Sequence, residues 1–214
     1  MGIFKRIFGQ KPDVSVDSVS FDTAGYQSKG GDAEKRVWFT PGGDGVGLFF
    51  FPKPPDLPAN AQTIDELREF YTKLIGDRGM KIVELRVQTV AGVDCVWVVL
   101  KSPRKPHGID YVGSLTIPFA DLSFVIKMQC QEGNITGMRE AALLVMTQQE
   151  GTVTLTPEGK ISGDWNPDDE RYDAKFPNHP VSRLRREFGR IIATLRIEDA
   201  ARNRARFKLP NGTV

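Results

Sequence analysis

Histidine and cysteine are scarce in this chain, and their scarcity limits the chemistry available to it. The 214 residues include two histidines, His107 and His179, and two cysteines, Cys95 and Cys130. A zinc site rich in histidine or cysteine is excluded by count. A nucleophilic site would need one of the two histidines beside a serine or cysteine. Because the sequence also lacks a Gly-x-Ser-x-Gly motif, we predict no catalytic residue and no cofactor.

The chain also lacks a strong net charge and a long apolar run. A net charge of +2 gives no argument for nucleic-acid binding, and no stretch is long and apolar enough for a transmembrane helix. Lys5 and Arg6 interrupt the apolar residues near the start, so this segment does not resemble a signal peptide. We interpret Cys95 and Cys130 as buried free thiols in a reducing, cytoplasmic compartment, with a disulfide as the alternative.

What is present indicates a globular protein. Hydrophobic residues make up 40% and charged residues 26% of the chain, which is ordinary for a soluble domain. A chain of this length can bury a substantial core without disulfides or metal. We expect one α+β domain over residues 13–198, a tail or short amphipathic helix over 1–12, and a basic tail over 199–214.

The clearest structural pattern lies between Gly108 and Glu132. Apolar residues alternate with polar ones on both sides of a turn at residues 119–121, which predicts an antiparallel hairpin with one buried face. A second hairpin is predicted at 35–51, around a glycine-rich turn. The run from Lys81 to Thr89 alternates as well, whereas 93–100 is apolar on both parities. That last run is typical of a central strand covered on both faces.

Three amphipathic helices are predicted. A capping box at Thr63 and Glu66 opens a helix over 64–78 that ends near Gly79. The next helix covers 136–149, and the last covers 180–195, with Pro180 as its first residue. The buried stripe of the middle helix should be Met138, Ala141, Ala142 and Val145. Blocks of strands separated by helices predict an α+β fold, with a largely antiparallel sheet of about six to eight strands flanked by the three helices.

This order of elements resembles the Mog1/PsbP-like α/β/α sandwich family, which includes the bacterial DcrB-type domains. The resemblance covers roughly residues 14–196 and rests on an early hairpin, a capped helix, a meander over 81–131 and two further helices. It implies a binding or adaptor protein, because members of that family act mostly as partners of other proteins. No catalytic residues carry over, and the segment 164–180 departs from the family pattern. A shared fold alone does not establish a function.

The acidic segment over residues 164–173 provides the best candidate metal ligands. Asp164, Asn166 and Asp168 have the 1, 3, 5 spacing of a calcium-binding loop. Position 6 of such a loop is Asp169 instead of glycine, and position 12 is Lys175 instead of glutamate. The alternative is a solvated acidic loop that pairs with arginines of the following helix.

Those arginines are the candidate partner-binding residues. Arg183, Arg185, Arg186 and Arg190 lie mostly off the apolar stripe of the last helix, which suits an anionic partner. The alternative is a solvated face that the acidic segment neutralises. Nucleic acid is disfavoured, because no aromatic side chains that could stack on bases are interleaved with them.

We therefore predict a non-enzymatic protein-interaction module of the adaptor, chaperone or immunity type, which holds a protein partner at a sheet edge or a helix-flanked groove. One alternative is an enzyme or small-molecule binder whose site combines dispersed residues such as Tyr111, Arg139 and Asp164. Another alternative is association with a membrane surface through an apolar face at the start of the chain, made of Ile3, Phe4, Ile7 and Phe8.

Overall fold

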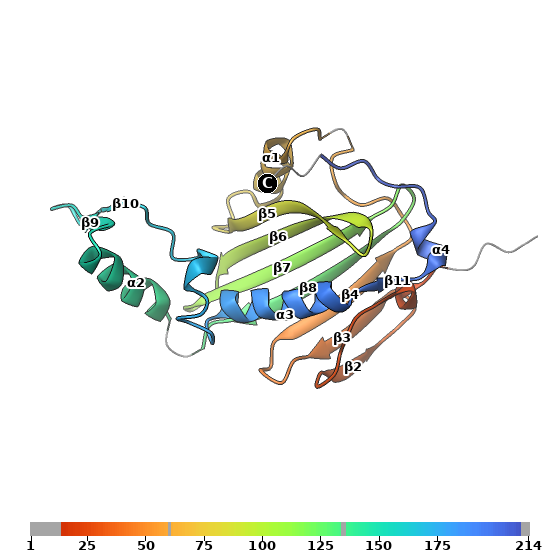
Figure 1. Cartoon of the computed structure of the whole chain (residues 1–214), viewed down its shortest axis with the longest axis horizontal. Helices are drawn as coiled ribbons and strands as arrows, with labels where there is room; N and C mark the ends of the chain where they lie inside the picture. Colours follow the sequence, from red (N-terminus) through yellow and green to blue (C-terminus); the bar gives the residue numbers. More distant parts are fainter. Residues whose placement is uncertain (1–13, 60, 134–135, 211–214) are drawn as a thin grey trace, which may run out of the picture.

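The fold is built on a seven-stranded antiparallel sheet (Figure 1). The computed structural model describes residues 14–59, 61–133 and 136–210. The strand order is β2-β3-β4-β8-β7-β6-β5, so β5 to β8 form a meander and β4 adds to it beside β8. Both predicted hairpins are confirmed. The strands are β2 (Gln27–Gly31), β3 (Lys35–Phe39), β4 (Gly45–Phe51), β5 (Lys81–Val90), β6 (Val93–Pro103), β7 (Ile109–Pro118) and β8 (Ser123–Gln131).

Two long helices cover opposite faces of this sheet, and a third lies beyond its end. Helix α3 (Pro180–Thr194) packs over β7 and β8, while α1 (Ile64–Ile75) packs on the other face near β5. Helix α2 (Met138–Gln149) projects past the strand ends together with the small hairpin of β9 (Val153–Leu155) and β10 (Ile161–Gly163), at the left of Figure 1. The predicted α+β class with an antiparallel sheet and helices is confirmed.

Strand β6 is buried on both faces, as its double-sided apolar pattern predicts. Cys95, Trp97 and Val99 belong to the large core under α3, whereas Val96 and Val98 belong to a smaller core under α1. Each of these five side chains is at most 2% exposed. The period of two in a strand therefore divides its residues between two separate cores.

The close approach of α3 to the sheet depends on Gly113 in β7. A Cβ atom at this position would lie 2.8 Å from Leu184 Cδ2 and 2.8 Å from Phe188 Cε2. Both distances are far below van der Waals contact, so only glycine lets the helix pack this closely. The helix is thereby fixed over β7, and its first turn is held at the end of the sheet.

Three details of the predicted helices are wrong. Helix α1 ends at Ile75 and is capped by Gly76, at φ 50°, instead of by Gly79. Helix α2 begins after Gly137. Its predicted stripe is not buried, because Met138 is 60% and Val145 54% exposed, and the buried residues are Arg139, Leu143 and Thr147. The buried face of α2 includes an arginine, and a search for apolar residues at helical spacing cannot identify such a face.

Several short elements complete the described part of the chain. The 3₁₀ turn η1 (Val16–Ser18) leads into β1 (Val19–Ser20), which pairs with β11 (Arg196–Ile197) after α3. A second 3₁₀ turn, η2 (Glu170–Tyr172), lies in the acidic segment. Helix α4 (Asp199–Arg202) opens the segment we set apart as a basic tail. Residues 199–210 pack against the rest of the domain. Arg206 forms an isolated antiparallel β-bridge with Phe119, and Leu209 packs against the core under α1.

Candidate functional site

The acidic segment is held against the sheet by Asp168. This carboxylate is 6% exposed and accepts hydrogen bonds from the Tyr111 hydroxyl, at 2.7 Å, and from the Lys101 ammonium group. Lys101 on β6 and Tyr111 on β7 are direct neighbours in the sheet, on the face that α3 covers. Burial and the neighbouring Asp168 carboxylate raise the pKa of Tyr111, so the hydroxyl stays protonated and donates.

Arg139 joins the first turn of α2 to the same segment. Its side chain is fully buried. It donates to the carbonyl oxygens of Pro167 and Asp169, at 2.6 and 2.8 Å, and to the Asp173 carboxylate at 3.0 Å. It also donates to Ser182 Oγ, at 2.7 Å, on α3. A buried guanidinium with this many acceptors is fully compensated, so it fixes α2, the acidic segment and α3 relative to one another.

The side chains of the three predicted calcium ligands all make contacts with other protein groups. Asp164 pairs with Arg171 at 3.1 Å, and its side chain is 74% exposed. Asn166 accepts from the backbone N–H of Asp168 at 3.2 Å, and the Asp168 carboxylate is engaged as described above. Calcium binding here stays a prediction. The acidic segment does pair with an arginine of the following helix, as the alternative interpretation predicts, because Asp173 binds Arg185 at 2.9 Å.

The dispersed site is assembled only in part. Tyr111 and Arg139 both bind the acidic segment, through Asp168 and through the carbonyl groups beside it. Asp164 lies at the exposed side of the segment and pairs with Arg171 instead. Two of the three predicted residues therefore share one buried polar network.

All four candidate partner-binding arginines have partners inside the protein, and Arg183 and Arg185 are the least exposed of them. Arg183 forms a two-pronged ion pair with Asp44, at 2.9 and 2.8 Å, before β4. Arg185 binds both Glu84 and Asp173. Arg186 is exposed, and Arg190 lies over the ring of Tyr26 at 4.4 Å. Partner binding by these arginines stays a prediction, and Arg186 is the most accessible of the four.

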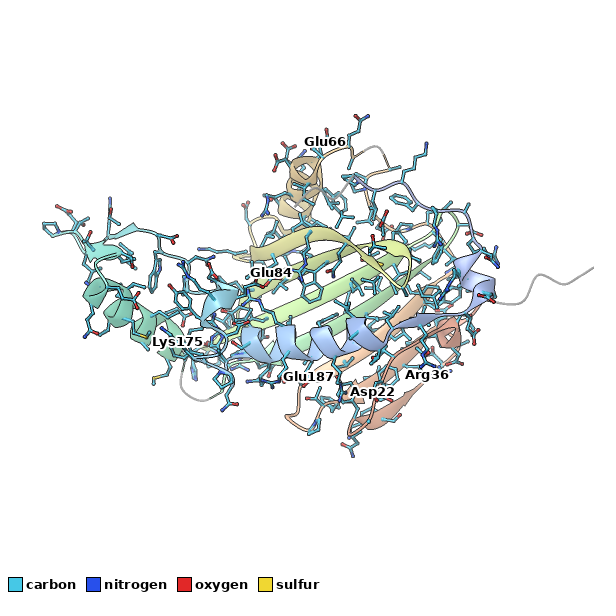
Figure 2. The ribbon with its side chains drawn as sticks, viewed as in Figure 1. Asp22, Arg36, Glu66, Glu84, Lys175 and Glu187 are labelled. Atoms are coloured by element: carbon cyan, nitrogen blue, oxygen red, sulfur yellow. The ribbon has the colours of Figure 1, made fainter. Side chains whose placement is uncertain are left out.

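A cavity of about 820 Å³ lies between β5, β6, η2 and α3. Trp97 and Phe188 form an apolar wall, with ring centroids 4.3 Å apart. Glu84 on β5, labelled in Figure 2, accepts a hydrogen bond from Trp97 Nε1 at 2.7 Å and contacts Arg185. The guanidinium of Arg86 lies over the Trp97 ring at 5.6 Å. Charged side chains of both signs, among them Asp173 and Arg171, line the rest of this cavity.

Sequence reasoning missed a second group of polar side chains at the same end of the sheet. Glu132, Glu140 and His179 offer donor atoms that all lie within 4.8 Å of one another. They come from the end of β8, the first turn of α2 and the residue before α3. Since long stretches of chain separate them, no spacing in the sequence could have indicated this cluster.

The α1 side of the sheet is covered over only part of its width. We define the open face as Val37 and Phe39 of β3, Phe49 and Phe51 of β4, and Val125 and Lys127 of β8, which share this side by register. Phe39 is 38% and Phe51 37% exposed, although both belong to apolar strands. An exposed group of large apolar side chains is unusual for a surface that meets only water.

A groove runs along the border between this open face and α1. Its volume is about 200 Å³. Phe51 and Val125 line the sheet side, Phe70 and Leu74 line the helix side, and the proline-rich connector after β4 forms one end. Leu74 is 59% exposed despite its place on the apolar stripe of α1. A helix therefore flanks this groove on one side, and partner binding in it stays a prediction.

Within the described residues, no helix has the length and apolar character needed to cross a membrane. The predicted membrane-surface residues Ile3, Phe4, Ile7 and Phe8 lie outside the described part of the chain, so that hypothesis stays a prediction. No family model matches the chain, and a search of curated proteins finds no relative.

Proposed function

We propose that this chain is a non-enzymatic protein-interaction module that binds its partner across the open face and the groove beside α1. The main support is the partial exposure of Phe39 and Phe51 on the open face, together with the groove beside it, which Phe51 and the exposed Leu74 line. Large apolar side chains gathered in one patch commonly mark a surface that another protein covers. The resemblance to the Mog1/PsbP-like family, itself a prediction, points to the same class of function.

The shape of the open face suits a flat partner surface or an extended segment. A Cβ at Gly47 would lie 2.6 Å from the Phe49 ring, so that ring lies down over the glycine. Glycine at position 47 therefore lets the Phe49 ring lie against the sheet, where it presents flat apolar area at low entropic cost.

The charges around this face define the chemistry of the partner. Lys127 lies within the open face and lines the groove, whereas Lys53, also in the lining, pairs with Asp56 at 3.8 Å. Lys29 on β2 sits over the Phe39 ring, 5.5 Å from its centroid. An apolar surface bordered by lysines favours a partner segment that combines apolar side chains with carboxylates, because opposite potentials steer the two together.

We place this activity in the cytoplasm. Both cysteines are free and buried, as expected in a reducing compartment. Burial raises the pKa of Cys95 to about 12 and raises that of Cys130 as well, so neither thiol is poised as a nucleophile. These two observations support a structural role for the cysteines.

The cavity beside Trp97 carries a second candidate function, the binding of a small molecule. Its apolar wall and the exposed guanidinium group of Arg86 would suit a planar ligand. Ligand binding there would quench or shift the fluorescence of Trp97. Replacing Arg86 by alanine should then weaken the binding, since this side chain is exposed and stacks on the indole ring.

Site-specific photo-crosslinking tests the interaction surface. A photo-reactive phenylalanine analogue is placed at position 39 or 127 in the open face and, as the control, at position 186 on α3. We expect one protein to be captured from positions 39 and 127 and not from 186. Capture from position 186 alone would reject the open face in favour of the arginine surface.

Charge reversal supplies the matched control for the captured partner. Lys127→Glu should weaken binding at least about tenfold, because a repulsive charge would then face the partner's carboxylates. Arg186→Glu makes the same change of charge on α3 and should leave the affinity unchanged. Equal effects of the two variants would indicate a general charge effect and would contradict the proposal.

A further inference from the structure

Three side chains from distant parts of the chain meet where the sheet, α2 and α3 adjoin. Glu132 directly follows β8, Glu140 lies in the first turn of α2, and His179 is the residue before α3. One donor atom from each lies within 4.8 Å of the other two. His179 Nε2 is 3.9 Å from Glu132 Oε1, which is too long for a hydrogen bond. The three donor atoms are close enough to converge on one cation once the side chains adjust.

Three buried polar atoms of His179 and Glu140 lack hydrogen-bond partners among the described residues. The His179 side chain is 8% exposed, and within the described residues neither of its ring nitrogens has a hydrogen-bond partner. Glu140 Oε2 is likewise buried and without a partner there. Buried polar atoms are almost always satisfied in folded proteins, because leaving one unpaired costs free energy. Two such residues facing the same gap indicate a shared ligand.

Glu132 is already oriented as a ligand would need to be. Its side chain is 4% exposed. Oε2 accepts from the backbone N–H of Ile109 at 2.9 Å, and Oε1 accepts from that of Gly137 at 3.2 Å. Each carboxylate oxygen retains a further lone pair for a cation. Hydrogen bonds of this kind fix the direction of metal-binding carboxylates in known sites.

The charges nearby permit a cation. Burial and the charge of Arg139 lower the pKa of His179 to about 4, so the imidazole is neutral at physiological pH and has a free lone pair. The Arg139 guanidinium is compensated by Asp173 at 3.0 Å. Two carboxylates and a neutral imidazole balance a double positive charge. Cavities of about 450 and 340 Å³ both have Glu132 in their walls and give access to the cluster.

We propose that Glu132, Glu140 and His179 bind a divalent transition-metal ion of the zinc type. Mixed nitrogen and oxygen donors suit such ions, whereas calcium and magnesium prefer oxygen ligands alone. Three protein ligands leave a fourth position for water or for a group from a partner. The ion would join the end of β8 to α2 and α3. This site is separate from the open face, so it stands independently of the proposed interaction surface.

The test measures metal binding by the full chain with matched variants. Zn²⁺ is added to the metal-free protein and followed by calorimetry, and Co²⁺ is added in parallel and followed by its visible absorption. His179→Gln is compared with His107→Gln, which alters the exposed histidine. Glu140→Gln is compared with Glu150→Gln at the other end of α2. Circular dichroism reports whether each variant is folded.

We expect one Zn²⁺ per chain and an increase in thermal stability on binding. His179→Gln and Glu140→Gln should weaken binding by more than the roughly 10- to 100-fold that loss of an outer hydrogen-bonding partner costs. The two controls should bind as the unaltered chain does. If His179→Gln does not fold, Glu140→Gln decides, because Glu140 is only partly buried. Absence of saturable binding, unchanged affinity in Glu140→Gln, or tighter binding of Ca²⁺ than of Zn²⁺ would overturn the proposal.

Discussion

The two faces of one sheet differ in how completely they are covered. Two neighbouring rows of side chains cross the same four strands, β6, β7, β8 and β4, and point to opposite faces. The row toward α3 is buried from end to end and consists of Trp97, Leu115, Ile126 and Leu48. The row toward α1 is buried at one end only and consists of Val96, Thr116, Val125 and Phe49.

This contrast separates residues that stabilise the fold from residues that do not. Burial of the apolar side chains under α3 stabilises the folded state by about 25 cal/mol per Å² of apolar surface removed from water. Phe39 and Phe51 keep more than a third of their surface exposed, so they contribute much less to the stability of the fold. Folding alone does not account for large aromatic residues at these positions. The partner that we propose would account for them.

The largest expected effect is a difference between two phenylalanines on adjacent strands. Phe124 is fully buried and pairs in register with Phe50, and Phe124→Ala should lower the free energy of unfolding by about 3–5 kcal/mol. Phe51→Ala on the open face should lower it by less than about 1 kcal/mol. Urea denaturation measures both. Similar losses would mean that the open face is part of the folded core.

A nearly equal loss is expected from Arg139→Ala. The change leaves the carbonyl groups of Pro167 and Asp169 without their buried donor and opens a cavity at the base of α2. We expect a loss of about 3–5 kcal/mol, as for other broken buried ion pairs. Arg186→Ala on the exposed side of α3 is the control and should change stability by no more than about 0.5 kcal/mol. Thermal unfolding of both variants supplies the comparison.

Two glycine-to-alanine changes should have smaller effects on stability, and the two effects should be opposite in sign. Gly113→Ala should destabilise the protein by about 1–3 kcal/mol, because the new methyl group collides with Leu184 and Phe188. Gly189→Ala in α3 meets no atom within 4 Å and should stabilise the helix by about 0.5–1 kcal/mol. Chemical denaturation of the two variants gives both values. If Gly113→Ala proves neutral, α3 can move away from the sheet and does not seal that face rigidly.

The strands could be predicted because their signal is local. Alternation of apolar and polar residues identified both hairpins, and the double-sided apolar run in β6 placed that strand under two cores. The same alternation could not show that α1 stops short of β4. Phe51 follows the pattern of a covered strand, and only the position of a helix in three dimensions leaves it exposed.

The polar clusters could not be predicted, since their members are brought together by tertiary structure. Arg139 was grouped with Tyr111 and Asp164 as a possible dispersed site, yet the acceptors of its side chain lie 28 to 43 residues further along the chain. His179 was placed correctly just before a helix. Nothing local indicated that Glu132 and Glu140 would face it. Long-range contacts of this kind leave no periodic trace in the sequence.

The position of β4 beside β8 also determines the order in which the chain can fold. The meander β5–β8 forms from neighbouring segments, whereas Gly45 must find Gln129 before β4 can join it. Pairing over so long a loop is slow. During synthesis β2–β4 leave the ribosome first and wait for β8 with their phenylalanines uncovered, a period in which aggregation competes with folding. The residues that we assign to partner binding are therefore also those a chaperone would need to shield, and pulse-labelling hydrogen exchange should show them protected last.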